Sequence, residues 1–426
     1  MSAGPRVPGR AALVLVPHEP TLDPRVHYTA ASLAKRYSVT VLATVQKGEE
    51  RPEGNQPQAA YSTERIPYRK DMGALRMALF FFALWLKSGP RQRTGGADSE
   101  GSALRGLRLA LSVLRFTLQA SDLMYRRAIR AAVAPDVVYC HDLYCLQAGV
   151  MLKRRWGARL VYDSHEYYPY RHLAPGFTGV IHAYEAVLVR EVDVYITVSP
   201  QLAGELERVY GVGPVHAIPN VEPLPDLELP VPTSEMLRLA DGRLKVLYQG
   251  AFAEGRGLEE VLREWTGADG TRVALFLRGP RNEWSQRLQR LAEELGLLGK
   301  SVYFLPPVLE KDLIAAAQEA DVGLIPYKGD LPSYRFACPN KLSQYLHAGL
   351  AILANRIPYV EQVVARGHAG LCYDVDEPGA FARAVETLIA DRPGVERFRR
   401  NALEFARREY SWERYEDVLL ALVEPR

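Results

Sequence analysis

Cysteine is scarce in this chain of 426 residues, and its four cysteines form no metal-binding or disulfide pattern. They are Cys140, Cys145, Cys338 and Cys372, and no two of them make a Cys-x-x-Cys pair. A zinc site or a disulfide framework is therefore not indicated. Long apolar runs are also absent, since none approaches the about 20 residues that a membrane-spanning helix needs. These absences exclude small disulfide scaffolds, zinc ribbons and polytopic membrane proteins.

A strong net charge is missing too, but the charges are unevenly distributed. The formal net charge is +3, whereas residues 65–130 hold thirteen lysines and arginines against four acids, a net of +9. This segment also contains the nine apolar residues Ala78–Leu86. Two interpretations stay open, namely a core helix with a solvated basic rim and a segment that lies in the interface of an anionic membrane. No recognition motif for nucleic acid accompanies the charge, so we expect no nucleic-acid partner.

The first apolar run, Ala11–Val16, is short and ends at a proline. It fits a first β-strand better than the apolar core of a secretory signal. We therefore expect a cytoplasmic protein, with peripheral binding to the cytoplasmic face of a membrane as the option that the basic segment allows.

Short β-branched runs alternate with helical stretches along the whole chain, which predicts parallel sheets with crossover helices. Asp23-Pro24 and Ser199-Pro200 each predict a helix start, with an N-cap followed by proline. The strands expected in the first half are Leu13–Val16, Val39–Ala43, Val137–Cys140, Leu160–Tyr162, Val194–Val198 and Val215–Ile218. Those expected in the second half are Lys245–Gln249, Ala274–Leu277, Val302–Leu305, Val322–Ile325, Ala351–Ala354 and Gly370–Tyr373.

A linker separates these two halves, because residues 219–234 carry five prolines and little helical pattern. We predict an α/β protein with two Rossmann-like domains that face each other across a cleft. The first domain is residues 1–222, with a basic apolar insert at about 65–130, and the second is residues 235–405.

The stretch from Pro339 to Ala354 predicts a helix that opens with proline, ends at Gly349 and leads into a buried strand. Its first turn, with Asn340 and Lys341, offers backbone N–H groups, the positive end of a helix dipole and an ammonium group. This combination suits an anion such as a diphosphate. Gln344 lies one turn further on the same face. The alternative is an ordinary α/β helix without a ligand.

A glycine-rich loop, Gly250–Leu258, follows one strand and opens a helix. Its glycines permit a tight turn near a phosphate, and Arg256 supplies a planar fork for two phosphate oxygens. The alternative is a surface arginine at a helix start, which the helix dipole would disfavour. Tyr334, in the loop before Pro339, and Tyr327 are candidates for stacking on a nucleotide base.

Polar residues also end two neighbouring strands of the first half. His141 and Asp142 follow one of them, and Asp163, His165 and Glu166 follow the next. By ligand type alone, several of these residues could hold a metal, namely His141, Asp142, Asp163 and His165.

These motifs resemble those of group 1 (family 4) glycosyltransferases of the GT-B fold. The helix is similar to the signature Pro-x-Lys-x-x-Glu-Tyr-x-x-x-Gly, but Gln344 replaces the glutamate that bonds the ribose of the donor. Phe336 replaces a carboxylate often found eight residues earlier. On this basis Gln344→Glu is expected to tighten donor binding. Tyr410–Arg414 and residues 406–426 around it resemble the family's C-terminal helix, which crosses back to the first domain.

The resemblance implies transfer of a sugar from a nucleoside-diphosphate sugar to an acceptor, with retention of configuration. The implied catalytic residues are His141, which meets the sugar, and Arg256 and Lys341, which stabilise the departing diphosphate. The implied donor-binding residues are Gly250, Gly255, Gly257, Asn340, Gln344 and Tyr334. The implied sugar or acceptor rim is Asp23, Asp142, Asp163, His165 and Glu166. Since GT-B enzymes generally use helix dipoles and basic side chains in place of a metal, neither a metal nor a cofactor is expected.

The expected partners are a nucleotide-sugar donor and a glycan or lipid-linked acceptor, with an anionic membrane surface as a further partner. Two alternatives stay open. A nucleotide-sugar epimerase of the same fold would need no acceptor surface, and a non-catalytic nucleotide-sugar-binding subunit is compatible with Gln344 and Phe336.

Overall fold

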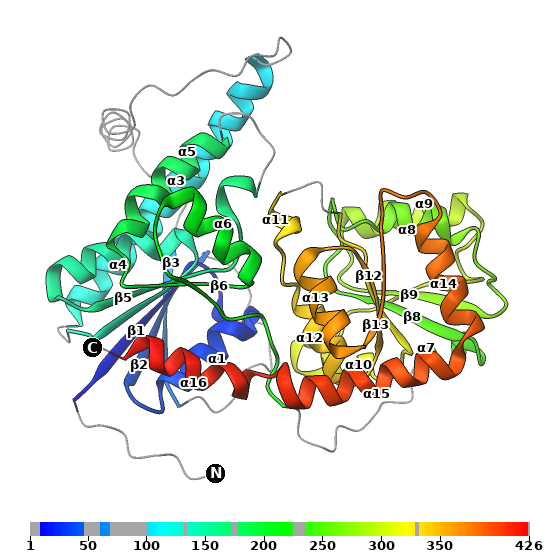
Figure 1. Cartoon of the computed structure of the whole chain (residues 1–426). Helices are drawn as coiled ribbons and strands as arrows, with labels where there is room; N and C mark the ends of the chain where they lie inside the picture. Colours follow the sequence, from blue (N-terminus) through cyan, green and yellow to red (C-terminus); the bar gives the residue numbers. More distant parts are fainter. Residues whose placement is uncertain are drawn as a thin grey trace. The chain divides into compact units, whose positions relative to one another are not determined.

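The computed structural model describes residues 9–46, 60–68, 100–131, 134–171, 177–224, 235–328 and 332–424. It divides into two compact units (Figure 1). Unit 1 comprises Met1–Ile218 and Glu416–Arg426, and unit 2 comprises Pro219–Tyr415. No helix in the described ranges is long and apolar enough to cross a membrane.

Unit 1 is built on a seven-stranded parallel sheet in the order β3-β2-β1-β4-β5-β6-β7. The strands are β1 (Ala11–Val16), β2 (Ser38–Gln46), β3 (Ser62–Tyr68), β4 (Val137–His141), β5 (Arg159–Ser164), β6 (Val194–Thr197) and β7 (Val215–Ala217). The helices are α1 (Pro24–Leu33), α3 (Glu100–Arg130), α4 (Leu143–Trp156), α5 (Phe177–Leu188) and α6 (Pro200–Tyr210). The Asp23 and Ser199 side chains cap α1 and α6, so both predicted helix starts are confirmed.

The six strands predicted in this half are confirmed, but β3 escaped prediction. Its sequence, Ser-Thr-Glu-Arg-Ile-Pro-Tyr, has no apolar run, and most of its residues are only partly buried. β3 lies at the sheet edge, where Pro67 removes no hydrogen bond from a second neighbour. An edge strand can therefore form without the apolar signal that marks the central strands.

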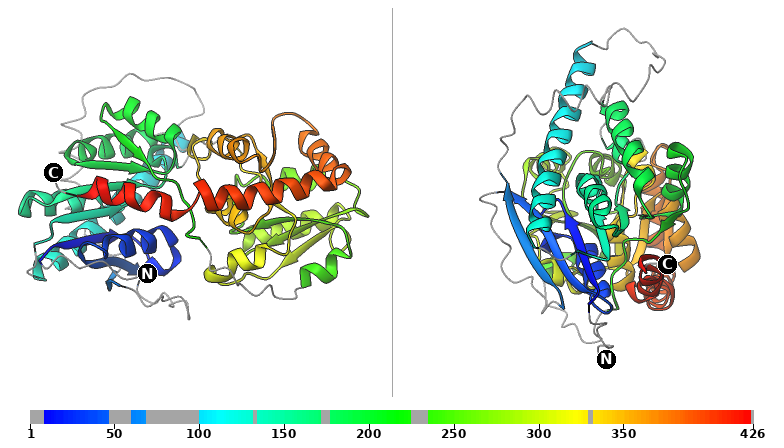
Figure 2. Two further views of the ribbon diagram at one scale, coloured as in Figure 1. Left: turned by 60° about the horizontal axis from the view of Figure 1, so that its bottom comes forward. Right: turned by 90° about the vertical axis from the view of Figure 1, so that its left-hand side faces the viewer.

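The basic segment 65–130 contributes to this architecture at both of its ends. Arg65 to Tyr68 belong to β3, and Glu100–Arg130 form the 31-residue helix α3, which packs on α4 and α5. The right-hand view of Figure 2 shows the amino-terminal part of α3 extending past the strands. The apolar run Ala78–Leu86 lies outside the described residues.

Unit 2 is built on a six-stranded parallel sheet in the order β10-β9-β8-β11-β12-β13. The strands are β8 (Leu244–Gln249), β9 (Val273–Arg278), β10 (Val302–Leu305), β11 (Val322–Ile325), β12 (Ala351–Asn355) and β13 (Gly370–Tyr373), which confirms all six predictions. The helices are α7 (Glu235–Ala240), α8 (Leu258–Trp265), α9 (Glu283–Glu294), α10 (Leu313–Ala317), α11 (Pro332–Arg335), α12 (Asn340–His347), α13 (Pro358–Gly367), α14 (Ala380–Ala390), α15 (Arg392–Glu409) and α16 (Trp412–Val423).

Helices flank the unit 2 sheet (Figure 1). Its central strands are apolar almost throughout. All six residues of β9 are buried, as expected of a parallel strand covered on both faces. The last helix, α16, starts in unit 2, and its residues from Glu416 onward belong to unit 1. There Glu416 accepts hydrogen bonds from Ser32 and Lys35.

The strand orders determine where ligands are expected. Each sheet has a point where the order reverses direction, between β1 and β4 in unit 1 and between β8 and β11 in unit 2. Open α/β sheets bind ligands outside the carboxyl ends of the strands at such points. His141 and Asp142 lie at the end of β4, and Asp163, His165 and Glu166 lie at the end of the adjacent strand β5. In unit 2, Arg256 follows β8 and Lys341 follows β11.

Candidate active site

In unit 1 the site is organised around a buried ion pair between Arg25 of α1 and Asp163 of β5. Arg25 Nε donates to Asp163 Oδ2 and a terminal nitrogen donates to Oδ1, both at 2.8 Å. Tyr139 donates its hydroxyl to Asp163 Oδ2 at 2.8 Å, and a further Arg25 nitrogen donates to the Ile218 carbonyl. Such a two-point pair is strong and geometrically specific. It connects α1, β4, β5 and the end of β7.

Two histidines lie beside this pair. His141, at the carboxyl end of β4, is fully buried, and its Nδ1 is 3.1 Å from His165 Nε2. Burial and then the neighbouring His165 charge lower the pKa of His141 to about 4. Burial also opposes the charge on His165, but Asp142, Asp163 and Asp23 overcome it and raise the pKa of His165 to about 9. At neutral pH, His165 is therefore the charged member of the pair.

These protonation states decide the tautomer of His141. Charged His165 has a proton on each ring nitrogen, so its Nε2 donates to His141 Nδ1 and the neutral His141 carries its own proton on Nε2. That buried Nε2 has no hydrogen-bond partner in the described part of the chain. An unsatisfied buried donor costs about 1–3 kcal/mol and calls for an explanation. It suits a sugar hydroxyl or a phosphate oxygen as acceptor.

The other predicted rim residues divide into two groups. Asp23 and Asp142 surround His165, with carboxylate oxygens 3.7 and 3.6 Å from its Nδ1. Asp142 has a φ of 69°, which is unusual for a residue other than glycine and is typical of functional sites. Glu166 instead is exposed and pairs with Arg171 at 3.0 Å. The structure therefore brings together Asp23, Asp142, Asp163, His141 and His165, but not Glu166.

A metal fits this cluster poorly, although the ligand atoms of His141, Asp163 and His165 lie within 4.8 Å of one another. Arg25 already occupies both oxygens of Asp163. His165 also favours a proton, and a protonated imidazole cannot bind a metal through that nitrogen. The residues thus supply fixed positive charge where a metal would have to bind.

In unit 2 the two predicted diphosphate ligands meet at one tyrosine. Lys341, in the first turn of α12, donates to the Tyr327 hydroxyl at 2.9 Å, and its Nζ is 4.4 Å from the ring centre of Tyr248. Arg256 lies with its guanidinium carbon 4.3 Å from the ring centre of Tyr327 and 5.4 Å from that of Tyr334. Arg256 is thus a partly buried arginine between aromatic rings, and these contacts occupy the two tyrosines considered for base stacking. Whether Tyr334 binds the donor stays a prediction.

The glycines of the loop before α8 bring Arg256 into this position. Gly250, Gly255 and Gly257 all have positive φ angles. A Cβ atom at Gly257 would lie 1.9 Å from the carbonyl oxygen of Pro326, so only glycine allows the loop to reach the end of β11. At Gly250 a Cβ atom would lie 3.5 Å from Lys341 Nζ, so this backbone borders the lysine.

The predicted geometry of α12 is confirmed at both ends. Pro339 is the N-cap residue, no side chain caps the helix start, and Gly349 follows the last turn with a φ of 69°. Asn340 is exposed at the first position of the helix, whereas Lys341 and Gln344 are buried. The first turn therefore presents the helix dipole next to Lys341.

We expect nucleoside diphosphate binding to take up a proton at Lys341. Burial and then the Arg256 charge hold the pKa of Lys341 well below its usual range. A bound diphosphate would raise this pKa, so affinity should fall by up to about tenfold per pH unit between the free and bound pKa values. Calorimetric titration with UDP at about pH 7.5–9, above the phosphate pKa of about 6, measures the uptake in buffers of different ionisation enthalpy. Lys341→Arg, which stays charged, should abolish it, and wild-type binding without proton uptake would contradict the assignment.

Gln344 contacts a residue that the sequence placed in the linker. Its Nε2 is 3.4 Å from Glu222 Oε1, and both side chains are buried. The first part of the expected linker, Pro219–Leu224, is ordered on unit 2 rather than free of it. Glu222 N donates to Ser343 Oγ, and Asn220 Nδ2 donates to the Cys338 carbonyl.

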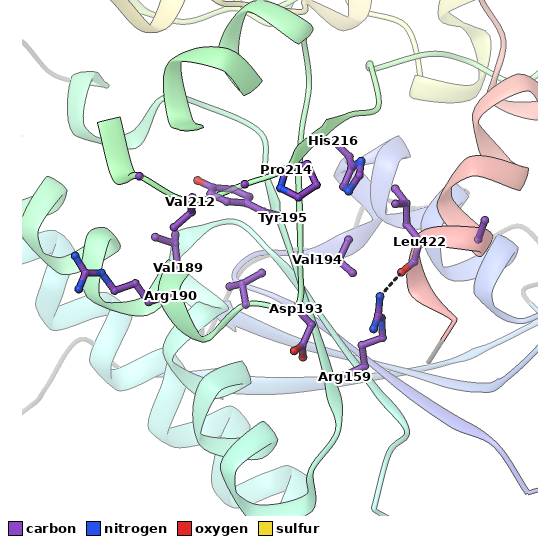
Figure 3. Close-up of a pocket in the computed structure, with 14 residues that line it drawn as sticks. Arg159, Val189, Arg190, Asp193, Val194, Tyr195, Val212, Pro214, His216 and Leu422 are labelled. Carbon is purple, nitrogen blue, oxygen red and sulfur yellow. Dashed lines mark hydrogen bonds between the residues drawn. The ribbon is translucent and has the colours of Figure 1, made fainter. Parts of the chain in front are cut away.

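A separate cavity of about 600 Å³ lies in unit 1 at the opposite end of the sheet (Figure 3). Arg159 and Val194, the first residues of β5 and β6, line it together with Leu422 of α16. Arg159 donates to the Leu422 carbonyl, and Asp193 accepts from Leu160 N and Lys153 Nζ. The Arg159 contact joins β5 to α16, and the Asp193 contacts join the residue before β6 to β5 and α4.

Sequence reasoning missed three polar residues of these sites, Arg25, Tyr139 and Glu222. Arg25 directly follows the predicted helix start Asp23-Pro24, but no role was predicted for it. A charged residue on the apolar side of α1 was the available signal, because buried arginines require a partner. Nothing in the local sequence marks Tyr139 or Glu222, since their partners are 24 and 122 residues away.

Comparison with known proteins agrees with the geometry of both units. Residues 95–221 match the family described as Glycosyltransferase Family 4, and residues 243–391 match Glycosyl transferases group 1. The chain is 26% identical over 319 residues to a D-inositol 3-phosphate glycosyltransferase from Nocardioides sp., covering 68% of each chain.

Solved structures show the same architecture. Sucrose-phosphate synthase from Thermosynechococcus elongatus superimposes with a TM-score of 0.68 at 17% identity, covering 97% of this chain and 98% of that one. HepE from Anabaena, solved in complex with UDP, gives a TM-score of 0.62 at 13% identity, covering 96% and 98%. The fold is therefore that of the GT-B class. With both family matches, the chain belongs to the glycosyltransferases of the family 4 and group 1 type.

Proposed function

We propose that the protein transfers a sugar from a nucleoside-diphosphate sugar to an acceptor with retention of configuration and without a metal ion. Unit 2 would bind the donor, with its diphosphate at the first turn of α12 between Lys341 and Arg256. In unit 1, the Nε2–H of His141 would position the sugar, while Arg25, Asp163 and His165 hold its tautomer.

One observation carries this proposal, namely the convergence of Arg256 and Lys341 on Tyr327 at the amino end of α12. Two cations near a helix start and a glycine-rich loop would stabilise the negative charge of a departing diphosphate. HepE, a protein of the same fold, was solved with UDP, and this supports the same ligand class here.

A ligand screen followed by an activity assay tests the proposal. Thermal unfolding is measured with UDP, GDP, ADP and dTDP, since a ligand at about 1,000 times its Kd stabilises the folded state by about 4 kcal/mol. The matching nucleotide sugars are then incubated with an acceptor panel that includes D-inositol 3-phosphate, named for the Nocardioides relative, and lipid-linked glycans. Transfer supports the proposal, while isomerised nucleotide sugar would identify an epimerase and binding without turnover a non-catalytic subunit.

Activity is expected to survive excess EDTA, because Arg256, Lys341 and the α12 dipole supply the charge that a metal gives other transferases. Initial rates are compared after chelation and after readdition of Mg²⁺ or Mn²⁺. Loss on chelation with recovery on readdition would contradict metal independence and direct attention to His141, Asp163 and His165.

We also propose reversible binding to anionic membranes through residues 65–130. Basic residues near an anionic leaflet contribute about 1 kcal/mol each, so vesicles rich in anionic lipid should sediment the protein at low salt and release it at high salt. Charge reversal at Arg76, Lys87, Arg91 and Arg93 should abolish sedimentation. A matched reversal at four exposed arginines of unit 2 should have little effect; these are Arg263, Arg281, Arg290 and Arg400. Protein that stays in the supernatant at low salt would contradict this proposal and favour a soluble acceptor.

A further inference from the structure

The contact between Gln344 and Glu222 lies in a buried part of unit 2, where hydrogen bonds also hold the backbone. The Gln344 side chain is 6% exposed and that of Glu222 is 8% exposed. The backbone of Glu222 is held on both sides, because its N–H donates to Ser343 Oγ at 2.8 Å and its carbonyl accepts from Trp412 N at 2.9 Å. The carboxylate is thus placed beside α12 by contacts that do not depend on Gln344.

This contact determines which way the Gln344 amide points. An ionised carboxylate only accepts hydrogen bonds, so the amide must present its NH₂ group to Glu222. The observed contact, from Gln344 Nε2 to Glu222 Oε1 at 3.4 Å, has this orientation. The carbonyl oxygen of Gln344 is then the atom left to accept a hydrogen bond from another group.

The position of Gln344 on the helix suggests what that group is. Gln344 lies three residues after Lys341, one turn further along the same face of α12. A helical turn rises about 5.4 Å, and in a nucleoside diphosphate the ribose is bonded directly to the first phosphate. A diphosphate at Lys341 therefore brings ribose hydroxyls, which are donors, within reach of Gln344.

We propose that Glu222 is a positioning residue that holds the carbonyl oxygen of Gln344 toward the ribose hydroxyls of a nucleoside diphosphate. This inference rests on the proposed function, since it requires that unit 2 binds such a ligand. Position 344 of α12 has an amide in place of the glutamate of the family signature. The Glu222 carboxylate, on the segment Pro219–Leu224, would supply the negative charge instead and would polarise the Gln344 amide.

The proposal reverses the expectation that Gln344→Glu tightens donor binding. In that variant two carboxylates would lie within hydrogen-bond distance of each other in a buried site. Like charges so placed repel, and one of them takes up a proton. Gln344→Glu alone should therefore bind no tighter than the wild type, whereas Gln344→Glu with Glu222→Gln restores one carboxylate and one amide.

The experiment measures ribose recognition separately from diphosphate binding. Calorimetry gives the Kd values of UDP, GDP and ADP and of their 2′,3′-dideoxy counterparts. For the nucleotide that binds best, the Kd of the dideoxy form divided by the Kd of the ribose form measures how much the ribose hydroxyls contribute to binding. Glu222→Gln should lower this ratio by about 3- to 10-fold, the usual effect of one hydrogen bond. The double variant should bring the ratio back to within threefold of the wild type, and inorganic pyrophosphate, which has no ribose, should bind all variants equally.

Glu413→Gln is the matched control. Glu413 is an exposed carboxylate that accepts a hydrogen bond from Leu224 N on the same segment, whereas the hydrogen bond to Gln344 is made by Glu222. Its ratio should stay at the wild-type value. An unchanged ratio in Glu222→Gln, or tighter binding by Gln344→Glu alone, overturns the inference. If no diphosphate binds the wild type, the proposed function fails first and the inference fails with it.

Discussion

Replacing Arg256 by alanine is expected to lower kcat/KM for the nucleotide sugar by about 30- to 1,000-fold. This corresponds to about 2–4 kcal/mol of lost transition-state stabilisation, the usual range for one preorganised group that meets developing charge. Arg256 lies against Tyr327 and Tyr334, so its guanidinium is held in place before the donor binds. Steady-state kinetics with the donor identified by the thermal screen measures the loss.

Two further variants test whether the loss in Arg256→Ala comes from the diphosphate site. Lys341→Ala should produce a loss of similar size, because both cations would meet the same diphosphate. Arg263→Ala removes an exposed arginine from the neighbouring helix α8 and should stay within threefold of the wild type. If Arg256→Ala and Lys341→Ala also stay within threefold, the donor site has been assigned to the wrong part of unit 2.

Asp163→Asn is expected to destabilise unit 1 by about 3–5 kcal/mol, because it leaves the buried Arg25 charge without a counter-charge. The Arg25 and Asp163 side chains are 5% and 0% exposed, so water cannot replace the lost interaction. For a unit of this size the transition in calorimetry should shift down by about 6–20 °C. The two units can unfold separately, so the transition of unit 1 is followed rather than a single midpoint.

The control for Asp163 is Asp122→Asn, which breaks an exposed pair with Arg126 on α3. Exposed pairs contribute about 0–1 kcal/mol, so this variant should shift the transition by a few degrees at most. Replacing Arg25 and Asp163 together by methionine and leucine should recover much of the stability but not the activity, since His165 loses one of its carboxylates. A normal transition in Asp163→Asn would show that the ion pair does not hold unit 1 together.

The sequence predicted the parts of the fold that depend on neighbours along the chain. Of the thirteen strands in the described ranges, twelve follow from apolar runs, because central parallel strands are buried on both faces and need such residues. The starts of α1 and α6 and the glycine that ends α12 follow from caps within a few residues. β3 was missed because an edge strand needs neither an apolar run nor two neighbours.

For the candidate site, too, some features were predictable from the sequence and others were not. The residue types and their positions near strand and helix ends were evident in the sequence, and they singled out Arg256, Lys341, His141 and Asp163. The strand orders then showed that these residues lie at or beside the switch points of the two sheets. Glu166 shows the limit of that reasoning, because its neighbour His165 enters the cluster while Glu166 faces outward and binds Arg171. Position next to a strand end does not decide which way a loop side chain turns.

By itself, the sequence determined the class of fold and the order of the elements, because apolar periodicity, caps and glycine positions are local properties, while its resemblance to a known family indicated the kind of chemistry. Only the tertiary structure decided the states of the groups that would act. The charge on His165, the tautomer of His141 and the orientation of Gln344 depend on partners 23 to 142 residues away, such as Asp142, Asp23 and Glu222. Protonation and amide orientation follow from burial and the nearest charges, and these exist only after the sheets and their helices have packed.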